Sequence, residues 1–525
     1  MSERAGPPRA AGSTAEGPVL LAEVVATSAA VSATRSRTAK RDAIAALVRR
    51  CSPDEVGVVV AHLSGVLPQR RLGVGFRSLG ALPPAAPVAE LTVADVDAAF
   101  DRLATAAGAG SATARRAELD ALLRRATGEE QQFLRGLITG NLRQGALDGV
   151  VLAAVAGAFE VPEAVVRRAT MLAGSTSAVA EEAARGGLPA LEEVGLVVGR
   201  PLRPMLASSA KTTGEAVEGF AGRTLLVDGK LDGIRIQVHR RDGDVAVFTR
   251  SLDEITGRVP EVVEAVAELP GGDLVLDGEA IVLDTAGRPA PFQVTGARTA
   301  SSADVARLRA EVPLTTFLFD VLHAAGSDLV DVPALERHEV LAELAPHLLV
   351  PRLVTEDPAA AERFFADLVA AGHEGVVVKD AAAPYAAGRR GSGWVKVKPA
   401  HTVDLVVLAV EWGSGRRRGW LSNIHLGARD PATGGFVMVG KTFKGMTDAM
   451  LRWQTERFTE LATDGTDGWV VPVRPEQVVE VAFDGLQRSS RYPGGVALRF
   501  ARVLRYRDDK RPEEADTIEG IRAFL

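Results

Sequence analysis

The stretch Lys230-Leu231-Asp232-Gly233-Ile234-Arg235 decides most of what we expect of this chain. An apolar run precedes it and an alternating run of apolar and polar residues follows, so Lys230 is expected to end one strand and Ile234 to begin the next. The Asp-Gly pair between them is typical of a tight turn. Arg235 is then expected to face outward, and two cations and a carboxylate meet at one rim of a sheet. A solvated charged turn would explain the same residues if they stood alone.

Lysine is rare in this chain, and its distribution is informative. Only nine of the 61 basic residues are Lys, and seven of those nine lie between residues 230 and 510. An amine can lose its proton and act as a nucleophile, whereas a guanidinium stays protonated. The remaining lysines are therefore candidates for chemistry that Arg cannot perform, with the random survival of a few lysines as the alternative.

The residues around the central stretch predict an α+β fold with antiparallel sheets. We expect a hairpin over residues 225–250, with its turn at Asp242-Gly243. Further strand patterns follow, and helical patterns separate them. The strand patterns are LVLDGEAIVL (274–283), TTFLFDVL (315–322), EGVVVKD (374–380) and GWVKVKP (393–399).

The chain divides into four ranges by pattern, which predicts a multidomain protein. Residues 1–18 lack an apolar segment and are expected to be a disordered tail. Residues 19–195 carry apolar residues at helical spacing, so an all-α domain is expected there. The α+β domain follows over residues 196–400. Residues 401–525 contain five strand patterns with one helix between the third and the fourth, which is typical of an OB-fold β-barrel, with a generic small barrel as the alternative.

Composition limits the class of protein. Hydrophobic residues make up 46% and charged residues 24% of the 525 residues, which is ordinary for a soluble globular protein. The most apolar window, 146–166, contains Asp148, Glu160 and Pro162, so a buried helix is expected there rather than a membrane span. The single cysteine, Cys51, excludes an internal disulfide and a multi-cysteine zinc site, and we expect it to be a small buried residue. We therefore expect a cytoplasmic protein with no membrane partner.

Seven short motifs occur in a fixed order between residues 205 and 510. They are Lys230-x-Asp232-Gly233-x-Arg235, Thr249-Arg250-Ser251, Asp277-Gly278-Glu279, Phe317-Leu318-Phe319-Asp320, EGVVVK (374–379), YAAGRRGSGWVKVK (385–398) and Arg507-Asp508-Asp509-Lys510. Any one of them is weak, whereas the ordered set is specific. Together they resemble the motifs of ATP-dependent DNA ligases, of the archaeal-like and eukaryotic-like type found in some bacteria, within the superfamily of covalent nucleotidyltransferases.

The resemblance implies that ATP donates adenylate to the amine of Lys230 and that pyrophosphate leaves. A free lysine with a pKa of ~10.4 is almost fully protonated at neutral pH, so neighbouring cations or burial have to lower that pKa. Lys396 and Lys398 lie on one face of a strand pattern and are expected to supply this cationic field and to bind the triphosphate. Arg507 and Lys510 are expected to orient the pyrophosphate when the barrel closes over the site.

The resemblance also implies a metal site and contacts to the nucleotide. Glu279 and Glu374, both expected at strand starts, would bind Mg²⁺ through oxygen, with salt-bridging surface acids as the alternative. Phe319 resembles the residue that stacks on adenine, with a core aromatic as the alternative. Asp228 stands where the family usually has a longer Glu that contacts the purine. The other candidate nucleotide or phosphate contacts are Arg235, Arg250 and Arg390.

Nicked duplex DNA is the partner that the resemblance implies, bound at the nucleoid by a monomer. Residues 19–195 would be the DNA-binding domain, residues 196–400 the adenylation domain and residues 401–525 the OB-fold domain. The net charge of −6 argues against indiscriminate nucleic-acid binding but permits a local basic groove. Four arginines of the helical range are candidate phosphate contacts, with solvated helix faces as the alternative. These are Arg70, Arg71, Arg135 and Arg143.

Four other functions have to be compared with this pattern. Lysine chemistry would also serve an RNA ligase or an mRNA capping guanylyltransferase, although these relatives usually lack a long helical range. A non-catalytic DNA-end scaffold would not need the intact lysine and glutamates of the motifs. NAD-dependent ligation is disfavoured because one cysteine cannot form the zinc module of those enzymes. The sequence leaves open whether such an enzyme serves replication or repair.

Overall fold

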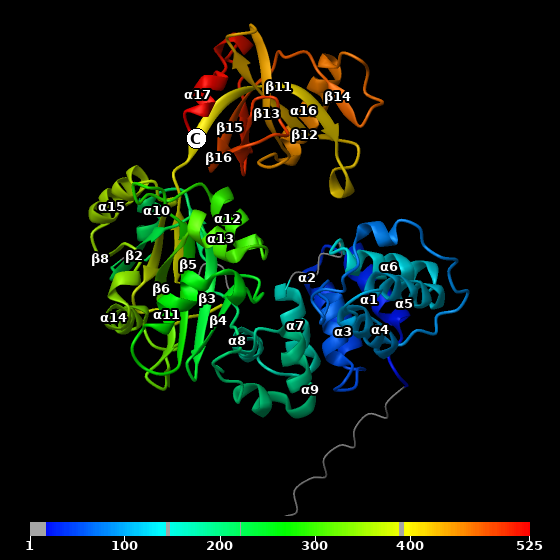
Figure 1. The fold of residues 1–525 in the computed structure, drawn as a ribbon. Helices are drawn as coiled ribbons and strands as arrows, with labels where there is room; N and C mark the ends of the chain where they lie inside the picture. The colour runs from blue at the N-terminus through cyan, green and yellow to red at the C-terminus, as the bar shows by residue number, and fades with distance from the viewer. Residues whose placement is uncertain (1–16, 143–147, 221, 388–392) are drawn as a thin grey trace, which may run out of the picture.

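A computed structural model describes residues 17–142, 148–220, 222–387 and 393–525. Residues 1–16 of the expected tail, as well as Arg143 and Arg390, lie outside the described residues. The chain is a multidomain α+β protein, and its paired strands are antiparallel except for β1 and β10. Figure 1 shows a helical part (residues 17–192), a two-sheet body (208–397) and a C-terminal part (401–525) arranged around an open centre.

The helical part contains nine described α-helices around one hydrophobic core. Side-chain caps define several helix starts: Thr92 and Asp95 form a capping box at α4, and Thr127 and Glu130 form one at α6. The core includes the fully buried Phe100. The helices are α1 (Leu21–Ala33), α2 (Arg37–Val48), α3 (Val56–Leu63), α4 (Val93–Thr105), α5 (Ser111–Arg125), α6 (Gly128–Ile138), α7 (Asp148–Ala158), α8 (Glu163–Ala173) and α9 (Thr176–Glu192).

The apolar window at 146–166 is not a single helix. Its described residues belong to α7 and α8, which are bent by 120° at a short break. Within the described residues no single helix is long and apolar enough to cross a membrane, although this bent pair meets the criterion by length and composition. Val151, Ala154 and Val155 of α7 are buried in the helical core. Cys51 packs against that core as a half-buried residue, so it is less buried than expected.

The two-sheet body consists of two five-stranded sheets. The first has the order β1-β10-β9-β2-β8 and the second the order β4-β3-β5-β6-β7. Trp394 of the first sheet packs with Val275 and Leu322 of the second sheet in one buried cluster. The strands are β1 (Ser208–Ala210), β2 (Leu225–Lys230), β3 (Ile234–Arg241), β4 (Asp244–Thr249), β5 (Leu274–Val282), β6 (Leu314–Ala324), β7 (Ser327–Asp328), β8 (Arg352–Thr355), β9 (Gly375–Asp380) and β10 (Trp394–Val397).

Helices cover the outer faces of both sheets. Residues of α10 and α15 share a core with the first sheet, and residues of α11 and α14 share one with the second sheet. Each sheet is therefore covered by helices on one face and by the other sheet on the opposite face. The helices of this body are α10 (Thr213–Glu218), α11 (Pro260–Ala267), α12 (Phe292–Ala300), α13 (Val305–Glu311), α14 (Ala334–Leu344) and α15 (Pro358–Ala370).

The expected hairpin over residues 225–250 was wrong at its first strand. β2 pairs with β8 and β9, whereas β3 pairs with β4 and β5, so only β3 and β4 form the hairpin around Asp242-Gly243. The chain passes from one sheet to the other over residues 231–233. Gly233 is required there because a Cβ atom would lie 2.2 Å from Cγ2 of Ile281. Lys230 therefore lies at the junction of two sheets and not at the rim of one.

The C-terminal part is built on a sheet of order β13-β12-β11-β15-β18. Helix α16 (Asp448–Leu461) follows the third strand, and α17 (Ile518–Arg522) ends the chain. The last of the five strand patterns expected in this range, ALRFARVLRYR (497–507), forms two strands and not one, because Phe500 between them has a φ of 55°. The strands are β11 (His401–Trp412), β12 (Leu421–Asp430), β13 (Gly435–Thr442), β14 (Val470–Pro472), β15 (Val478–Phe483), β16 (Gly485–Arg488), β17 (Val496–Arg499) and β18 (Arg502–Tyr506).

Candidate active site

Lys230 ends β2 with its amine next to a carboxylate. Its Nζ forms an ion pair with Glu374, and the other carboxylate oxygen of Glu374 pairs with Lys398. Strand pairing fixes this arrangement, because the N–H of Glu374 donates to the carbonyl oxygen of Lys230 at 2.9 Å immediately before β9 begins. The side chain of Lys230 is 23% exposed, so a ligand can reach the amine.

Lys230 faces a cavity of about 1490 Å³ that residues of all three parts line. Most of the candidates from the sequence meet there. They are Asp228, Lys230, Arg235, Arg250, Glu279, Phe319, Glu374, Lys396 and Lys398, joined by Arg71 of the helical part. The C-terminal part contributes Arg499 and Phe500 to the wall.

Glu279 lies inside β5 and not at a strand start as expected, whereas Glu374 does directly precede β9. The N–H of Gly233 donates to Glu279 at 3.1 Å, so the crossing between the sheets also orients this carboxylate. Burial raises the pKa of Glu279 to about 7, although Lys230 and Arg235 act in the opposite direction. A cation bound near Glu279 would therefore offset the unfavourable free energy of burying the ionised carboxylate.

Two further lysines lie on the same side of the cavity. Burial, followed by the charges of Lys398 and Lys230, lowers the pKa of Lys396 below its ordinary value. Burial also acts to lower the pKa of Lys398, but Glu374 and Asp484 outweigh it and raise that pKa. The wall around Lys230 thus carries a concentrated positive charge that a polyphosphate would neutralise.

An aromatic pocket with a buried charge cluster forms one end of the cavity. Phe319 and Trp394 meet edge to face with ring centroids 5.9 Å apart. Lys379 lies 2.6 Å from Asp228 and 4.8 Å from the centroid of the Phe319 ring. Arg352 also pairs with Asp228, and these two cations hold the pKa of the Asp228 carboxyl below its usual range despite its burial. The carboxylate of Asp228 is therefore already engaged by two protein cations.

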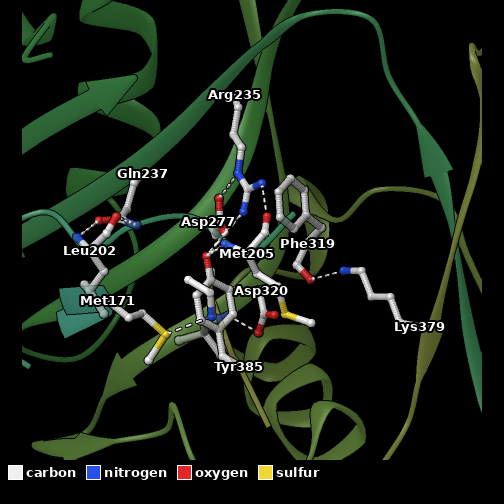
Figure 2. A network of polar contacts seen from close by, with 12 residues as sticks. Met171, Leu202, Met205, Arg235, Gln237, Asp277, Phe319, Asp320, Lys379 and Tyr385 are labelled. Carbon is white, nitrogen blue, oxygen red and sulfur yellow. Dashed lines mark hydrogen bonds and ion pairs between the residues drawn. The ribbon is translucent and has the colours of Figure 1, made fainter. Parts of the chain in front are cut away.

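Arg235 does not face outward as expected. Figure 2 shows its guanidinium turned toward Asp277 and Tyr385, with the Phe319 ring beside it. It donates to Asp277 at 2.9 and 2.5 Å, and to the carbonyl oxygen of Met205 at 2.6 Å. Alternation failed to predict this because β3 lies between two neighbours in a sheet that is covered on both faces. Arg235 still lines the cavity, with 15% of its side chain exposed.

Arg507 and Lys510 are not brought to the cavity. Arg507 pairs with Asp404 at 3.2 Å and Lys510 pairs with the same carboxylate at 2.5 Å. The C-terminal part instead contacts the cavity through other residues. These are Arg499, which pairs with Asp232, the side chain of Phe500, and Asp484, which lies 3.3 Å from Lys398.

The candidate arginines of the helical part lie in different surroundings, and only some of them are near the cavity. Arg71 lines the cavity, and Arg70 donates to the carbonyl oxygen of Leu252 in the two-sheet body. Arg135 lies over the ring of the exposed Phe76, 5.4 Å from its centroid. Arg143, like Arg390 of the two-sheet body, is outside the described residues.

Several residues at or beside the cavity were missed by the sequence. Arg499 lines the cavity and Arg352 pairs with the lining residue Asp228, but both belong to segments without a motif, and Trp394 lies in a motif but was assigned no role. The distribution of Arg could not distinguish these functional arginines from the others, because 52 of the 61 basic residues are Arg. The dipeptide Arg499-Phe500 offered one clue, since a cation and an aromatic ring next to each other can form a cation–π contact, and here the Arg499 guanidinium lies 5.8 Å from the centroid of the Phe500 ring.

Family models match most of the chain. The model "ATP dependent DNA ligase domain" matches residues 204–398, the model "ATP dependent DNA ligase C terminal region" matches residues 417–510, and the model "DNA ligase N terminus" matches residues 74–156. A cavity with a lysine amine, two glutamates and flanking cations within such matches defines the class of the protein, a nucleotidyltransferase.

Relatives match along nearly the whole length. A "Probable DNA ligase" of Beutenbergia cavernae is 63% identical over 514 residues, covering 96% of this chain and 99% of the relative. One of Mycolicibacterium paratuberculosis is 58% identical over 509 residues, covering 96% and 98%. The solved structure named Pmar-Lig_PreS3 shares the fold, with a TM-score of 0.62 and 18% identity over 92% of this chain and 99% of that chain. The chain belongs to the family of ATP-dependent DNA ligases.

Proposed function

We propose that this ATP-dependent DNA ligase seals nicks between a 5′-phosphate and a 3′-OH in duplex DNA, with Lys230 as the nucleophile. The Lys230 amine forms a bond to the α-phosphorus of ATP while the bond to the bridging oxygen of the β-phosphate breaks, and pyrophosphate leaves. The 5′-phosphate of the nick then accepts AMP, and the 3′-OH displaces it. The observation that carries this proposal is the Lys230 amine, oriented by Glu374, in a cavity that Glu279 and Lys396 also line.

Glu279 and Glu374 fit a divalent cation. Both are carboxylates on the wall beside Lys230, and burial disfavours the charged form of Glu279 until a cation is near. Among the described residues no group of three or more His, Cys, Asp or Glu side chains could hold a metal ion. This fits Mg²⁺, which usually takes one or two carboxylates and completes its shell with water and phosphate oxygens. Mg²⁺ would neutralise charge on the phosphates, while Lys396 and Lys398 bind them.

The aromatic pocket is the proposed site of the adenine. Phe319 and Trp394 line this part of the cavity and meet edge to face, and Lys379 and Arg235 lie over the Phe319 ring at 4.8 and 5.4 Å from its centroid. Asp228 is held rigidly by Arg352 and Lys379, so its role in binding the purine would depend on this cluster. Arg235 and Arg250 are proposed nucleotide or phosphate contacts, since guanidinium groups suit phosphate oxygens.

We also propose roles for the other parts of the chain. The strand order β13-β12-β11-β15-β18 with a helix after the third strand supports an OB fold over residues 401–525. The nine helices support a DNA-binding domain over residues 19–195, followed by an adenylation domain over residues 196–400. We further propose that the protein acts as a monomer, because one chain carries the lysine, both glutamates and the flanking cations that the reaction needs.

Mass spectrometry of the purified protein after incubation with ATP tests the nucleophile. The wild type is expected to gain one AMP, and added pyrophosphate is expected to remove it. Lys230→Ala should lose the adduct and all sealing with ATP, yet still seal DNA that already carries a 5′-AMP, since that last step does not use the amine. Lys211→Ala removes an exposed lysine outside the cavity and should keep the adduct. An undiminished adduct in Lys230→Ala would overturn the proposal.

A further inference from the structure

A turn of the helical part reaches into the two-sheet body, and its own domain holds it firmly. The side chain of Gln69 donates to Asp97 at 2.7 Å and to Asp101 at 2.8 Å, both on α4. Leu72 is 3% exposed and belongs to the helical core. The two residues between these anchors, Arg70 and Arg71, therefore have a defined direction.

Arg70 ties this turn to a loop of the two-sheet body. Its Nη1 donates to the carbonyl oxygen of Leu252 at 2.6 Å and lies 3.7 Å from the carboxylate of Asp253. Both Arg70 and Leu252 have left-handed backbone conformations, with φ of 59° and 65°. Such conformations are costly for these residue types and persist where surrounding contacts hold them. The contact thus fixes the loop that carries Arg250.

Arg71 is directed into the catalytic cavity by the same turn. It lines the wall together with Arg250, Ser251 and Arg258. No described residue forms a hydrogen bond or an ion pair with the side chain of Arg71 or of Arg250, and both residues are exposed. Asp253 and Glu254 also line this part of the cavity, but neither pairs with Arg71 or Arg250. Two guanidinium groups from the helical part and the two-sheet body thus face the cavity without an ion-pair partner among the described residues, which suits the binding of a phosphate group.

We propose that the helical part supplies Arg71 to the catalytic cavity as a phosphate-binding residue, and that Arg70 is a positioning residue that holds the Arg250 loop. The inference rests on the proposed function, because it assigns a phosphate of that reaction. The triphosphate of ATP and the 5′-phosphate of the nick share the chemistry that Arg71 would bind. The helical part would then act in catalysis as well as in holding the duplex.

Two single-turnover measurements on the full-length enzyme separate these phosphates. The first follows AMP transfer from ATP to the enzyme without DNA, and the second follows AMP transfer from the charged enzyme to saturating nicked duplex. Arg71→Ala is expected to slow one of them by about tenfold or more, the effect of one lost charge-assisted hydrogen bond. Arg77→Ala is the matched control, because it removes an exposed arginine of the same domain that does not line the cavity.

The step that slows identifies the phosphate. A loss in the first measurement assigns Arg71 to the triphosphate, a loss in the second assigns it to the nick, and a loss in both assigns it to both. Rates equal to those of Arg77→Ala in both measurements would overturn the proposal. Failure of the wild type to form the AMP adduct would instead refute the proposed function.

Arg70→Asn tests the positioning role. Asn tolerates a left-handed backbone, so the variant removes the guanidinium while preserving the turn. We expect the step that Arg71→Ala slows to slow here as well, by a smaller factor and with an unchanged melting temperature. Loss of both rates together with a lower melting temperature would mean that Arg70 acts only on folding. Rates equal to the control would mean that the contact positions nothing.

Discussion

Gly233 connects backbone geometry to chemistry at a single residue. It lies where the chain passes between the sheets, three residues after Lys230, and its N–H orients Glu279. A Cβ atom here would lie 2.2 Å from Cγ2 of Ile281 and 2.5 Å from the carbonyl oxygen of Ala280. The backbone oxygen cannot move away without disturbing β5.

Gly233→Ala should therefore destabilise the protein by ~2 kcal/mol or more and displace the Glu279 carboxylate. Thermal unfolding and the rate of AMP adduct formation measure the two effects. Gly257→Ala is the control, because a Cβ atom added there meets nothing within 4 Å. A Gly233→Ala protein that melts and reacts like this control would contradict the argument.

The residues that carry reactive groups could be predicted, but their directions could not. The lysine census and the ordered motifs identified Lys230, Glu279, Glu374 and Lys396, all of which line one cavity. The alternation of apolar and polar residues wrongly predicted that the Arg235 side chain faces outward. In a sheet that is covered on both faces, each side chain is buried whichever way it points. Which acid a buried arginine pairs with depends on contacts between distant strands, and sequence spacing does not report those.

At the scale of elements, buried ion pairs join the strands to their covering helices. Arg337 of α14 donates to Asp320 of β6 at 2.7 and 2.9 Å, and the side chains are 1% and 5% exposed. Removing one partner of such a pair leaves an uncompensated buried charge. This buried pair was not predicted, because nothing in a helix sequence distinguishes a buried arginine from a solvated one.

Asp320→Ala should accordingly destabilise the two-sheet body by about 3–5 kcal/mol. Asp331→Ala provides the comparison, since Asp331 pairs with Arg168 at 2.7 Å on the surface, with exposed fractions of 67% and 48%. That exposed pair should contribute about 0–1 kcal/mol. Urea unfolding of both variants measures the difference. Similar losses in the free energy of unfolding would show that the buried pair stabilises the fold no more than the exposed pair does.

The helical part contains a histidine whose burial makes its stability depend on pH. His62 of α3 is 0% exposed, meets Phe100 edge to face at 5.9 Å, and has no hydrogen-bond partner on either ring nitrogen among the described residues. Burial lowers the pKa of His62 to about 4, against 6.5 for a free histidine. Between these values the unfolded chain binds the proton and the folded chain does not, so stability falls as pH falls from 6.5 to 4.

His62→Leu should remove this dependence. In the wild type we expect the opening free energy of α3 and α4 to fall by about 2 kcal/mol between pH 7 and pH 5, and in the variant to change much less. Hydrogen exchange of the amides in these two helices measures it. If both proteins lose protection equally over that range, His62 is not the titrating group.

At the scale of the whole molecule, the orientation of the C-terminal part decides which residues meet the nucleotide. In this structure its contacts with the cavity run through the Asp232–Arg499 and Lys398–Asp484 ion pairs. Arg507 and Lys510 lie elsewhere, both paired with Asp404. Local patterns predicted the helix after the third strand, but they could not predict this orientation, because it depends on a few polar contacts between separate domains.

Arg507→Ala and Lys510→Ala should therefore separate the steps of the reaction. If these residues orient pyrophosphate, the C-terminal part has to turn and break the two ion pairs during the ATP step alone. Each variant should then slow adduct formation from ATP by about tenfold or more, while sealing of DNA that carries a 5′-AMP stays within about threefold of the wild type. Equal slowing of both steps would mean that the two cations act in the orientation seen here, through Asp404 and the fold, and that no turn is needed.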